Sequence, residues 1–364
     1  MAEPDIGSKE REYMNEAFDS GWISSKGPFI AKFEDEFARF SETRYAVSCS
    51  NGTSALHLAV RSLGIGEGDE VIVPDLTFAS PANVVLYEKG KPVIVDVDRT
   101  YWCIDPEKVR ESITNKTKAI IVVHLYGHPA DMDSIMNIAR ENNLRVIEDC
   151  AEAHGAIYKG KKVGSIGDIG CFSFYGNKII TTGEGGMITS NKDKLAERIR
   201  ILRDHGMAPS RRYWHDEVGY NYRMTNIQAA IGLAQMESIE KKISKRKWIA
   251  RKYSEYIGDE AELQPEMSWG SNVYWLPTFL LNSNLGSVSR ESLIKLLAEN
   301  GVESRPAFYP LHEMPPYKND LPFPISNYIS YHGISLPVSN KFDKDDIRFI
   351  SEVFNDSLSK LRQH

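Results

Sequence analysis

The chain has 364 residues, 41% of them hydrophobic and 26% charged, a globular composition that excludes disordered and fibrous proteins. Its 44 Lys and Arg against 50 Asp and Glu give a net charge of −6, which disfavours a nucleic-acid partner because phosphate binding needs a basic surface. No apolar run approaches the ~18 residues of a membrane span. The first residues, MAEPDIGSKERE, lack the apolar core of a secretory signal. We therefore expect a cytoplasmic protein with no membrane partner.

Strands and helices alternate over the first two-thirds of the chain. Strands are predicted over residues 45–48, 70–73, 92–95, 119–123, 144–147, 170–174 and 186–189, where short apolar runs occur. Amphipathic helices are predicted between them, over residues 53–62, 81–87, 106–113 and 132–142. This alternation predicts an α/β fold with a large, mainly parallel sheet covered on both faces. Ligands of such sheets bind at the carboxyl ends of the strands.

The last third of the chain has a different pattern. Residues 227–257 have helical periodicity and dense charge, and residues 258–270 are polar and contain a proline. Beyond them we predict a strand over 273–281 and helices over 289–300 and 343–361. The predicted organisation is a large α/β domain over residues 1–257 and a small α+β domain over residues 258–364.

The cysteines and histidines give no sign of a metal site. The four cysteines, Cys49, Cys103, Cys150 and Cys171, are widely spaced and predict buried, reduced thiols. His124 and His128 are four residues apart, but a glycine and a proline between and after them disfavour a helical zinc pair. We expect no metal. The sequence also has no P-loop, no GxSxG motif, and no GxGxxG that follows a strand.

The segment SNGTSALHLA combines a turn with the start of a helix. Asn51, Gly52, Thr53 and Ser54 supply free backbone N–H groups and hydroxyls at a helix N-terminus, an arrangement that binds anions. The same residue types are also favoured as ordinary helix caps. Phosphate binding and plain capping both stay open on this motif alone.

Two further motifs place polar groups at strand ends. In VIEDCAEAHG, Asp149 ends a hydrophobic strand and is either a helix cap or the partner of a cationic group. In GCFSFYGNK, a strand leads to Ser173 and then to Lys178 in a glycine-rich run. A lysine beside an apolar wall can lose its proton and form a Schiff base, although a surface lysine in a loop is the simpler interpretation.

The three motifs are informative together. They supply an anion cradle, a carboxylate and a lysine at the strand ends of one sheet. A phosphorylated pyridine aldehyde needs these three groups: the cradle binds its phosphate, the carboxylate keeps the ring nitrogen protonated, and the lysine forms an imine with the aldehyde.

The sequence resembles the DegT/DnrJ/EryC1/StrS family of sugar aminotransferases, which depend on pyridoxal 5'-phosphate (PLP). The resemblance covers nearly the whole chain and is carried by five motifs in the family's order: SNGTSALHLA, VIVPDLTFASPANVV, VIEDCAEAHG, GDIGCFSFYGNK and GYNYRMTNIQAAIG. It implies the fold type I of PLP-dependent transferases, the aspartate aminotransferase-like fold.

The resemblance also implies roles for individual residues. Lys178 matches the Schiff-base lysine, Asp149 the partner of the pyridine nitrogen, and Glu152 a polar residue near the ring hydroxyl. The phosphate would be held by the matched residues Gly52, Thr53, Ser54 and Ser173, and the ring would stack on Phe78. Asn221, in GYNYRM, matches an asparagine that reaches the phosphate of a neighbouring subunit, which implies a homodimer with shared active sites.

The implied reaction moves an amino group from L-glutamate to C4 of a nucleotide-linked 4-keto-6-deoxy sugar, a precursor of O-antigen polysaccharide. GDP-4-keto-6-deoxymannose is the expected substrate, on overall resemblance. A UDP- or dTDP-linked sugar, or amination at C3, stays an alternative. A PLP-dependent sugar dehydratase is disfavoured because those relatives have histidine in place of Lys178. A non-catalytic nucleotide-binding protein would have no need for the lysine and Asp149.

Substrate contacts are expected away from the imine. Lys26 and Arg305 are the candidates for the nucleotide diphosphate, because both are cationic and lie in the motifs ISSKGPF and ESRPAFYPLH. Trp22, Tyr309 and His312 lie near them in the sequence and complete the candidate set. For each of these five residues, a surface position without any substrate contact remains an equal alternative.

Overall fold

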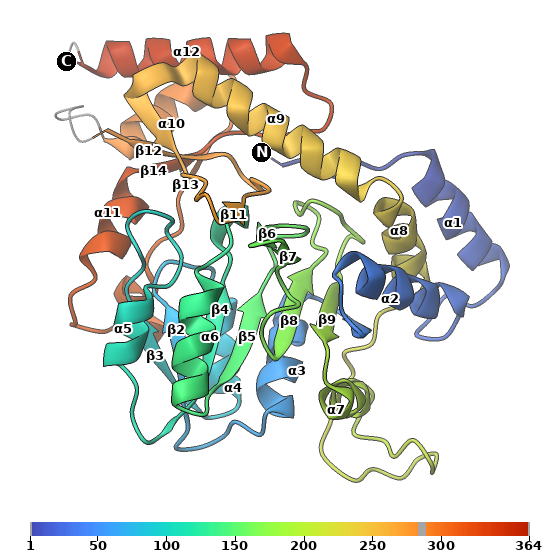
Figure 1. The fold of residues 1–364 in the computed structure, drawn as a ribbon. Helices are drawn as coiled ribbons and strands as arrows, with labels where there is room; N and C mark the ends of the chain where they lie inside the picture. The colour runs from blue at the N-terminus through green and yellow to red at the C-terminus, as the bar shows by residue number, and fades with distance from the viewer. Residues whose placement is uncertain (1, 283–288, 363–364) are drawn as a thin grey trace.

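A seven-stranded sheet forms the centre of the computed structural model, which describes residues 2–282 and 289–362 (Figure 1). The strand order is β1-β9-β8-β5-β4-β2-β3, and β9 runs antiparallel to both of its neighbours while β8, β5, β4, β2 and β3 pair in parallel. The strands are β1 (Tyr45–Cys49), β2 (Glu70–Pro74), β3 (Lys91–Val95), β4 (Thr117–Val123), β5 (Arg145–Asp149), β8 (Ile169–Ser173) and β9 (Gly186–Ser190). The predicted mainly parallel sheet is confirmed.

Helices cover both faces of this sheet. The two faces bury different apolar clusters because successive residues of a strand point to opposite sides: in β4, Ile120 and Val122 belong to one cluster, and Ala119 and Ile121 to the other. The first cluster is covered by α2 (Pro28–Phe40), α5 (Pro106–Glu111) and α6 (Met132–Glu141). The second is covered by α3 (Gly52–Ser62), α4 (Ser80–Tyr87) and α7 (Asp193–Arg203).

A second, antiparallel sheet is built from the C-terminal part of the chain. Its order is β10-β12-β14-β13, and a small three-stranded sheet has the order β11-β6-β7. The bounds are β10 (Ala261–Leu263), β12 (Thr278–Leu281), β13 (Arg305–Pro306), β14 (Gly333–Ser335), β6 (Ile157–Tyr158), β7 (Lys161–Lys162) and β11 (Gly270–Ser271). The helices of this part are α9 (Ile239–Ile257), α10 (Arg290–Glu299), α11 (Pro324–His332) and α12 (Lys344–Arg362). The domain boundary at residue 257 stays a prediction.

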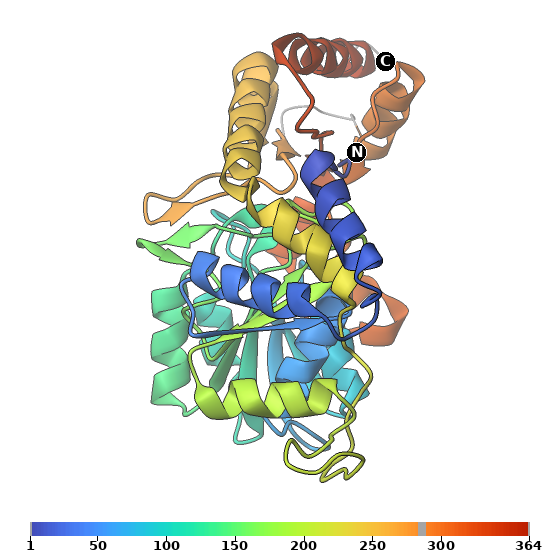
Figure 2. The ribbon, with the colours of Figure 1, turned by 90° about the vertical axis from the view of Figure 1, so that its right-hand side faces the viewer.

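The long helical stretch predicted over residues 227–257 is two helices, α8 (Asn226–Met236) and α9. Ser238 leaves helical geometry between them, with φ −119° and ψ 6°. Figure 2 shows that the two helices have different neighbours: α8 lies beside α1 (Ser8–Asp19) and α2, whereas α9 packs against α12. At Gly232 an added Cβ would lie 2.6 Å from the Phe33 ring, so glycine permits the close contact of α8 with α2.

The prediction of one strand over residues 273–281 is wrong for its first half. Only Thr278–Leu281 forms β12, and the residues before it cross to the large sheet. There the N–H of Val273 donates to the Gly127 carbonyl at 3.2 Å, and the N–H of Trp275 donates to the Tyr126 carbonyl at 2.9 Å. These residues are apolar because they are buried against the large sheet, which periodicity alone cannot distinguish from a strand.

Two further expectations concern the state of the cysteines and the presence of membrane-spanning helices. All four cysteines are buried and free, as predicted. Among the helices that the structure describes, none combines the length and apolar character needed to cross a bilayer.

Candidate active site

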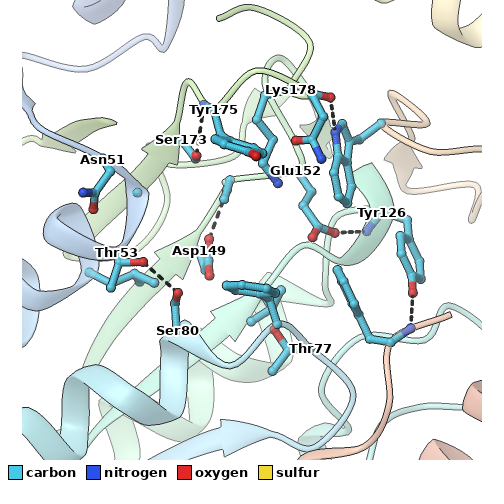
Figure 3. A pocket seen from close by; sticks show the side chains of 18 of the residues that line it. Asn51, Thr53, Thr77, Ser80, Tyr126, Asp149, Glu152, Ser173, Tyr175 and Lys178 are labelled. Atoms are coloured by element: carbon cyan, nitrogen blue, oxygen red, sulfur yellow. Dashed lines mark hydrogen bonds between the residues drawn. The ribbon is translucent and has the colours of Figure 1, made fainter. Parts of the chain in front are cut away.

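The carboxyl ends of β1, β2, β4, β5 and β8 surround a cavity of about 760 Å³. Figure 3 shows Asp149, Glu152 and Lys178 directed into the same space, with Thr53 and Ser80 on one side and Tyr126 on the other. We call these two sides the polar end and the aromatic end of the cavity. The aromatic end is defined by Tyr126, Trp275 and Phe308.

The polar end is built at the start of α3. Asn51 caps this helix, because its Oδ1 accepts the N–H of Ser54 at 2.8 Å. The N–H groups of Gly52 and Thr53 have no intrahelical partner, as in the first turn of any helix, and both residues line the cavity. The Thr53 hydroxyl is hydrogen bonded to the Ser80 hydroxyl at 2.8 Å. Free N–H groups and hydroxyls at a helix N-terminus form an anion cradle.

Ser173 lies at the end of β8, directly beside this helix start. A Cβ placed on Gly52 would lie 2.7 Å from the Ser173 Cβ, so only glycine allows the two segments to approach this closely. Ser54 also lines the cavity, but its hydroxyl donates to Asn51 Oδ1 at 2.9 Å and therefore supports the cap. The cradle thus consists of the first N–H groups of α3 with the hydroxyls of Thr53 and Ser173.

Asp149 is the last residue of β5 and is only 6% exposed. Its Oδ1 accepts the N–H of Ala151 at 3.0 Å. Burial raises the pKa of the carboxyl, and this outweighs the opposing effects of the Ala151 N–H and of the Lys178 amine. A buried carboxylate in this situation gains stability from a cationic partner, such as a protonated ring nitrogen.

Lys178 follows β8 in a turn, where its N–H donates to the Tyr175 carbonyl at 2.9 Å. Desolvation at the base of the cavity lowers the pKa of its amine, although the carboxyl groups of Glu152 and Asp149 favour the ammonium form. The amine lies 3.7 Å from the centroid of the Trp275 ring. An amine with a lowered pKa is a better nucleophile and base near neutral pH.

Glu152 faces Lys178 from the turn after β5. Its Oε2 accepts the N–H of Tyr126 at 2.7 Å. Burial raises the pKa of Glu152 to about 7, with the Lys178 amine and the Tyr126 N–H opposing the shift. Near neutral pH this carboxyl can therefore either donate or accept a proton.

A buried cluster behind Asp149 has the composition of a metal site. The possible ligand atoms of His124, Glu148 and Cys150 lie within 4.8 Å of one another. Hydrogen bonds occupy most of them: His124 Nε2 is 3.1 Å from Glu148 Oε2, the N–H of Ala130 donates to His124 Nδ1, and the carboxylate accepts three backbone N–H groups from residues 164–167. The cluster anchors the loop that follows Gly164 to the end of β5.

The aromatic end was missed by the sequence analysis. The Tyr126 hydroxyl accepts the N–H of Phe308 at 2.8 Å, and the rings of these two residues stack at 5.4 Å. The rings of Tyr126 and Trp275 stack on the other side, at 6.4 Å and 13°. No local motif marks these residues, because they come from three distant segments and are brought together only by the fold.

Nine of the predicted site residues line the cavity, and five do not. The cavity lining contains the cofactor residues Gly52, Thr53, Ser54, Phe78, Asp149, Glu152, Ser173 and Lys178 and the substrate candidate Arg305. Among the residues that the structure describes, the lining does not include Trp22, Lys26, Asn221, Tyr309 and His312. Phe78 is 60% exposed, which leaves its ring free to stack on a ligand.

His312 and Asn221 have other neighbours within one chain. The ring of His312 is buried and its Nδ1 lies 2.7 Å from Asp75 Oδ2, so this histidine joins the C-terminal part to the loop after β2 and does not face the cavity. The amide oxygen of Asn221 accepts two hydrogen bonds from the Arg223 guanidinium, at 2.8 and 3.1 Å. Asn221 is exposed.

Known proteins resemble this chain over nearly its whole length. Residues 4–355 match the model of the DegT/DnrJ/EryC1/StrS aminotransferase family. The chain is 47% identical to GDP-perosamine synthase of Escherichia coli O157:H7, with 98% of each chain covered, and 48% identical to that of Caulobacter vibrioides, with 95% of each covered. The structure of an aminotransferase from Psychrobacter cryohalolentis superposes with a TM-score of 0.92 at 31% identity over 99% of both chains. The chain therefore belongs to the DegT/DnrJ/EryC1/StrS aminotransferase family.

Proposed function

We propose that the cavity binds PLP and that the protein is an aminotransferase for a nucleotide-linked keto sugar. The residues present fit the cofactor: the start of α3 with Ser173 would hold the phosphate, Asp149 the ring nitrogen, and Phe78 the ring face. Lys178 would carry the cofactor as an imine. When bound, PLP supplies an aldehyde that condenses with amines and a ring that withdraws electrons from the carbon being deprotonated.

The chain's own residues supply the proton transfers and the electrostatics. Lys178 would act as the base and acid that takes a proton from the substrate carbon and later returns one, with its amine as the proton carrier. Asp149 keeps the ring nitrogen charged, which stabilises negative charge where it develops. Burial raises the pKa of Glu152 to about 7, so this carboxyl would share a proton with the ring hydroxyl near physiological pH.

The substrate we propose is GDP-4-keto-6-deoxymannose, aminated at C4 to GDP-perosamine with L-glutamate as the donor. The observation that carries this is the 47–48% identity, over nearly full length, to two relatives described as GDP-perosamine synthase. The product would be a precursor of O-antigen polysaccharide. The four free, buried cysteines support a reducing compartment such as the cytoplasm.

A substrate panel tests this proposal. Purified protein loaded with PLP is incubated with L-glutamate and either the GDP-linked or the UDP-linked 4-keto-6-deoxy sugar, and the amino sugar is quantified by mass spectrometry. We expect kcat/KM to favour the GDP sugar by at least about 100-fold, since a site that pairs with one base leaves polar groups unpaired when the other enters. A preference for the UDP sugar would overturn the substrate and leave the aminotransferase proposal standing.

The second candidate is an aminotransferase for a dTDP- or UDP-linked sugar. Relatives described as acting on a dTDP-linked or a UDP-linked sugar are 37% and 38% identical to this chain, less than the 47–48% of the two GDP-perosamine synthases. A sugar dehydratase is disfavoured by the lysine at position 178. Arg305, in the cavity lining, remains the candidate for the diphosphate of either nucleotide, and Lys26, Trp22 and Tyr309 remain candidates only if the site extends beyond the described cavity.

We also infer a homodimer in which Asn221 completes the phosphate site of the partner. Its support is the position of Asn221, exposed and outside the cavity of its own chain, together with large exposed apolar side chains at Trp22, Trp214 and Val218. Mixing an inactive Lys178→Ala variant with an inactive Asn221→Ala variant should restore activity through hybrid dimers. A fully active monomer in sedimentation would contradict this.

A further inference from the structure

Trp275 is held in place from four directions. Its N–H donates to the Tyr126 carbonyl at 2.9 Å and its indole Nε1–H donates to the Asn177 carbonyl at 2.8 Å. Its own carbonyl accepts a hydrogen bond at 2.8 Å from Arg246, a guanidinium of α9 that is only 1% exposed. The ring of Tyr126 stacks on its other side. The indole is 4% exposed and has no freedom to turn away from the cavity.

The cavity-side face of this ring lies against the Lys178 amine. The Nζ atom is 3.7 Å from the ring centroid, well within the ~6 Å range of a cation–π contact. The other titratable groups that act on this amine are the carboxyls of Asp149 and Glu152 and the His154 imidazole. The phenols of Tyr126 and Tyr175 and the guanidinium of Arg305 line the same cavity. Of these, only the two carboxyls attract an ammonium, and the chemistry proposed for Asp149 requires it to pair with the cofactor ring.

We propose that Trp275 is a positioning residue for Lys178: its indole face holds the released amine and favours the ammonium form without drawing on Asp149. The inference rests on the proposed role of Lys178 as the residue that carries the cofactor and moves the proton. An aromatic face attracts a cation through its quadrupole and has no charge of its own to neutralise. The carboxylate of Asp149 is therefore left for the ring nitrogen in every stage in which the amine is free.

Competitive labelling of the full-length, cofactor-free protein measures this directly. A trace of acetic anhydride is applied across a pH series, and the acetylated fraction of Lys178 is read by peptide mass spectrometry to give the midpoint of its titration. In Trp275→Leu the midpoint should fall by about one pH unit or more, because the partner of the ammonium is removed. Trp275→Phe, which keeps a weaker aromatic face, should fall by less.

Trp269→Leu is the matched control. This tryptophan lies in the same segment but packs on Tyr101, His128 and Tyr158, away from Lys178, so its loss should leave the midpoint unchanged. An unchanged or higher midpoint in Trp275→Leu would overturn the proposal. A higher midpoint would mean that the indole acts mainly by excluding water from the amine. Should Trp275→Leu fail to fold, the shift in Trp275→Phe decides in the same way.

A kinetic readout separates this proposal from the proposed function. In Trp275→Phe we expect kcat to fall several-fold with the KM for glutamate nearly unchanged, because the contact positions the proton-transferring amine. The labelling midpoint is measured without turnover. It therefore tests Trp275 even if the substrate panel shows no amino transfer, in which case the proposed function fails alone.

Discussion

The polar and aromatic ends of the cavity are built in opposite ways. At the polar end, Asn51 and Thr53 belong to one strand–helix turn. Ser80, the first residue of α4, and Ser173, the last residue of β8, join them. At the aromatic end, Tyr126, Trp275 and Phe308 come from three segments that meet only in the folded chain. A backbone turn can bind an anion by itself, whereas an aromatic wall needs the C-terminal part of the chain to be in place.

The difference has a consequence for function. Groups at the polar end would hold the cofactor's phosphate, which takes no part in bond making, so their loss should weaken cofactor binding. At the aromatic end, Trp275 contacts the Lys178 amine, and the other two rings would border the space for the sugar. Their loss should change turnover or substrate KM and leave cofactor affinity almost unaltered.

The largest effect is expected where the two ends meet, at Lys178. Lys178→Ala should lose at least about 10⁴-fold in turnover, because imine formation and proton transfer both depend on this amine. The measurement is amino-sugar formation by mass spectrometry, with circular dichroism to check folding. Lys161→Ala, at an exposed lysine, serves as the control and should keep normal rates. Substantial turnover by Lys178→Ala would contradict the proposed role of Lys178 in imine formation and proton transfer.

Asp149→Asn should be nearly as severe. The amide has the same shape but cannot hold a charged ring nitrogen, so we expect kcat to fall by roughly 10²–10³-fold through lost electrostatic stabilisation. Cofactor retention, measured by absorbance, and the melting temperature should stay close to those of the unchanged protein. Near-normal rates would mean that the carboxylate only caps the turn at Ala151.

The polar end itself is tested by Ser173→Ala. Removing one hydroxyl that hydrogen bonds a phosphate should cost about 1.5–3 kcal/mol, which corresponds to roughly 10–100-fold weaker cofactor binding, with kcat restored at saturating cofactor. Phe308→Leu is the counterpart at the aromatic end and should raise the sugar KM with little change in cofactor affinity. The comparison of the two ends fails if both variants show the same pattern.

The smallest expected effect concerns stability and His128, which lies behind the aromatic end. Its Nδ1–H donates to the Pro129 carbonyl and its Nε2 accepts the N–H of Met267, and burial lowers its pKa from 6.5 to about 4. The unfolded chain therefore binds a proton that the folded chain excludes, so stability is full above about pH 6.5 and is lost as the pH falls toward 4.

His128→Gln isolates this contribution. The pH-dependent loss of unfolding free energy between pH 7 and pH 5 should be smaller in the variant, by on the order of 1–2 kcal/mol. Urea unfolding at the two pH values gives the comparison, and the variant's lower stability at pH 7 does not affect it. Equal losses in the two proteins would show that His128 is not a source of acid sensitivity.

Much of the fold and of the polar end could be predicted because their signals are local. The seven strands were found from short apolar runs, and Asn51, Asp149 and Lys178 stand at or just beyond strand ends that parallel topology brings to one edge. The break between α8 and α9 was missed because helical periodicity continues through Ser238, and only packing on two different layers separates the helices.

The sequence by itself determined the βα alternation, the residue types at the strand ends and the family. Only the tertiary structure decided that residues 273–277 pack against the large sheet and do not extend β12, that Trp275 meets the Lys178 amine, and that His312 pairs with Asp75. The physical reason is the sequence separation over which each interaction acts. Caps, turns and strand ends depend on neighbours in sequence, whereas burial of an aromatic ring or a histidine depends on which distant segment packs against it.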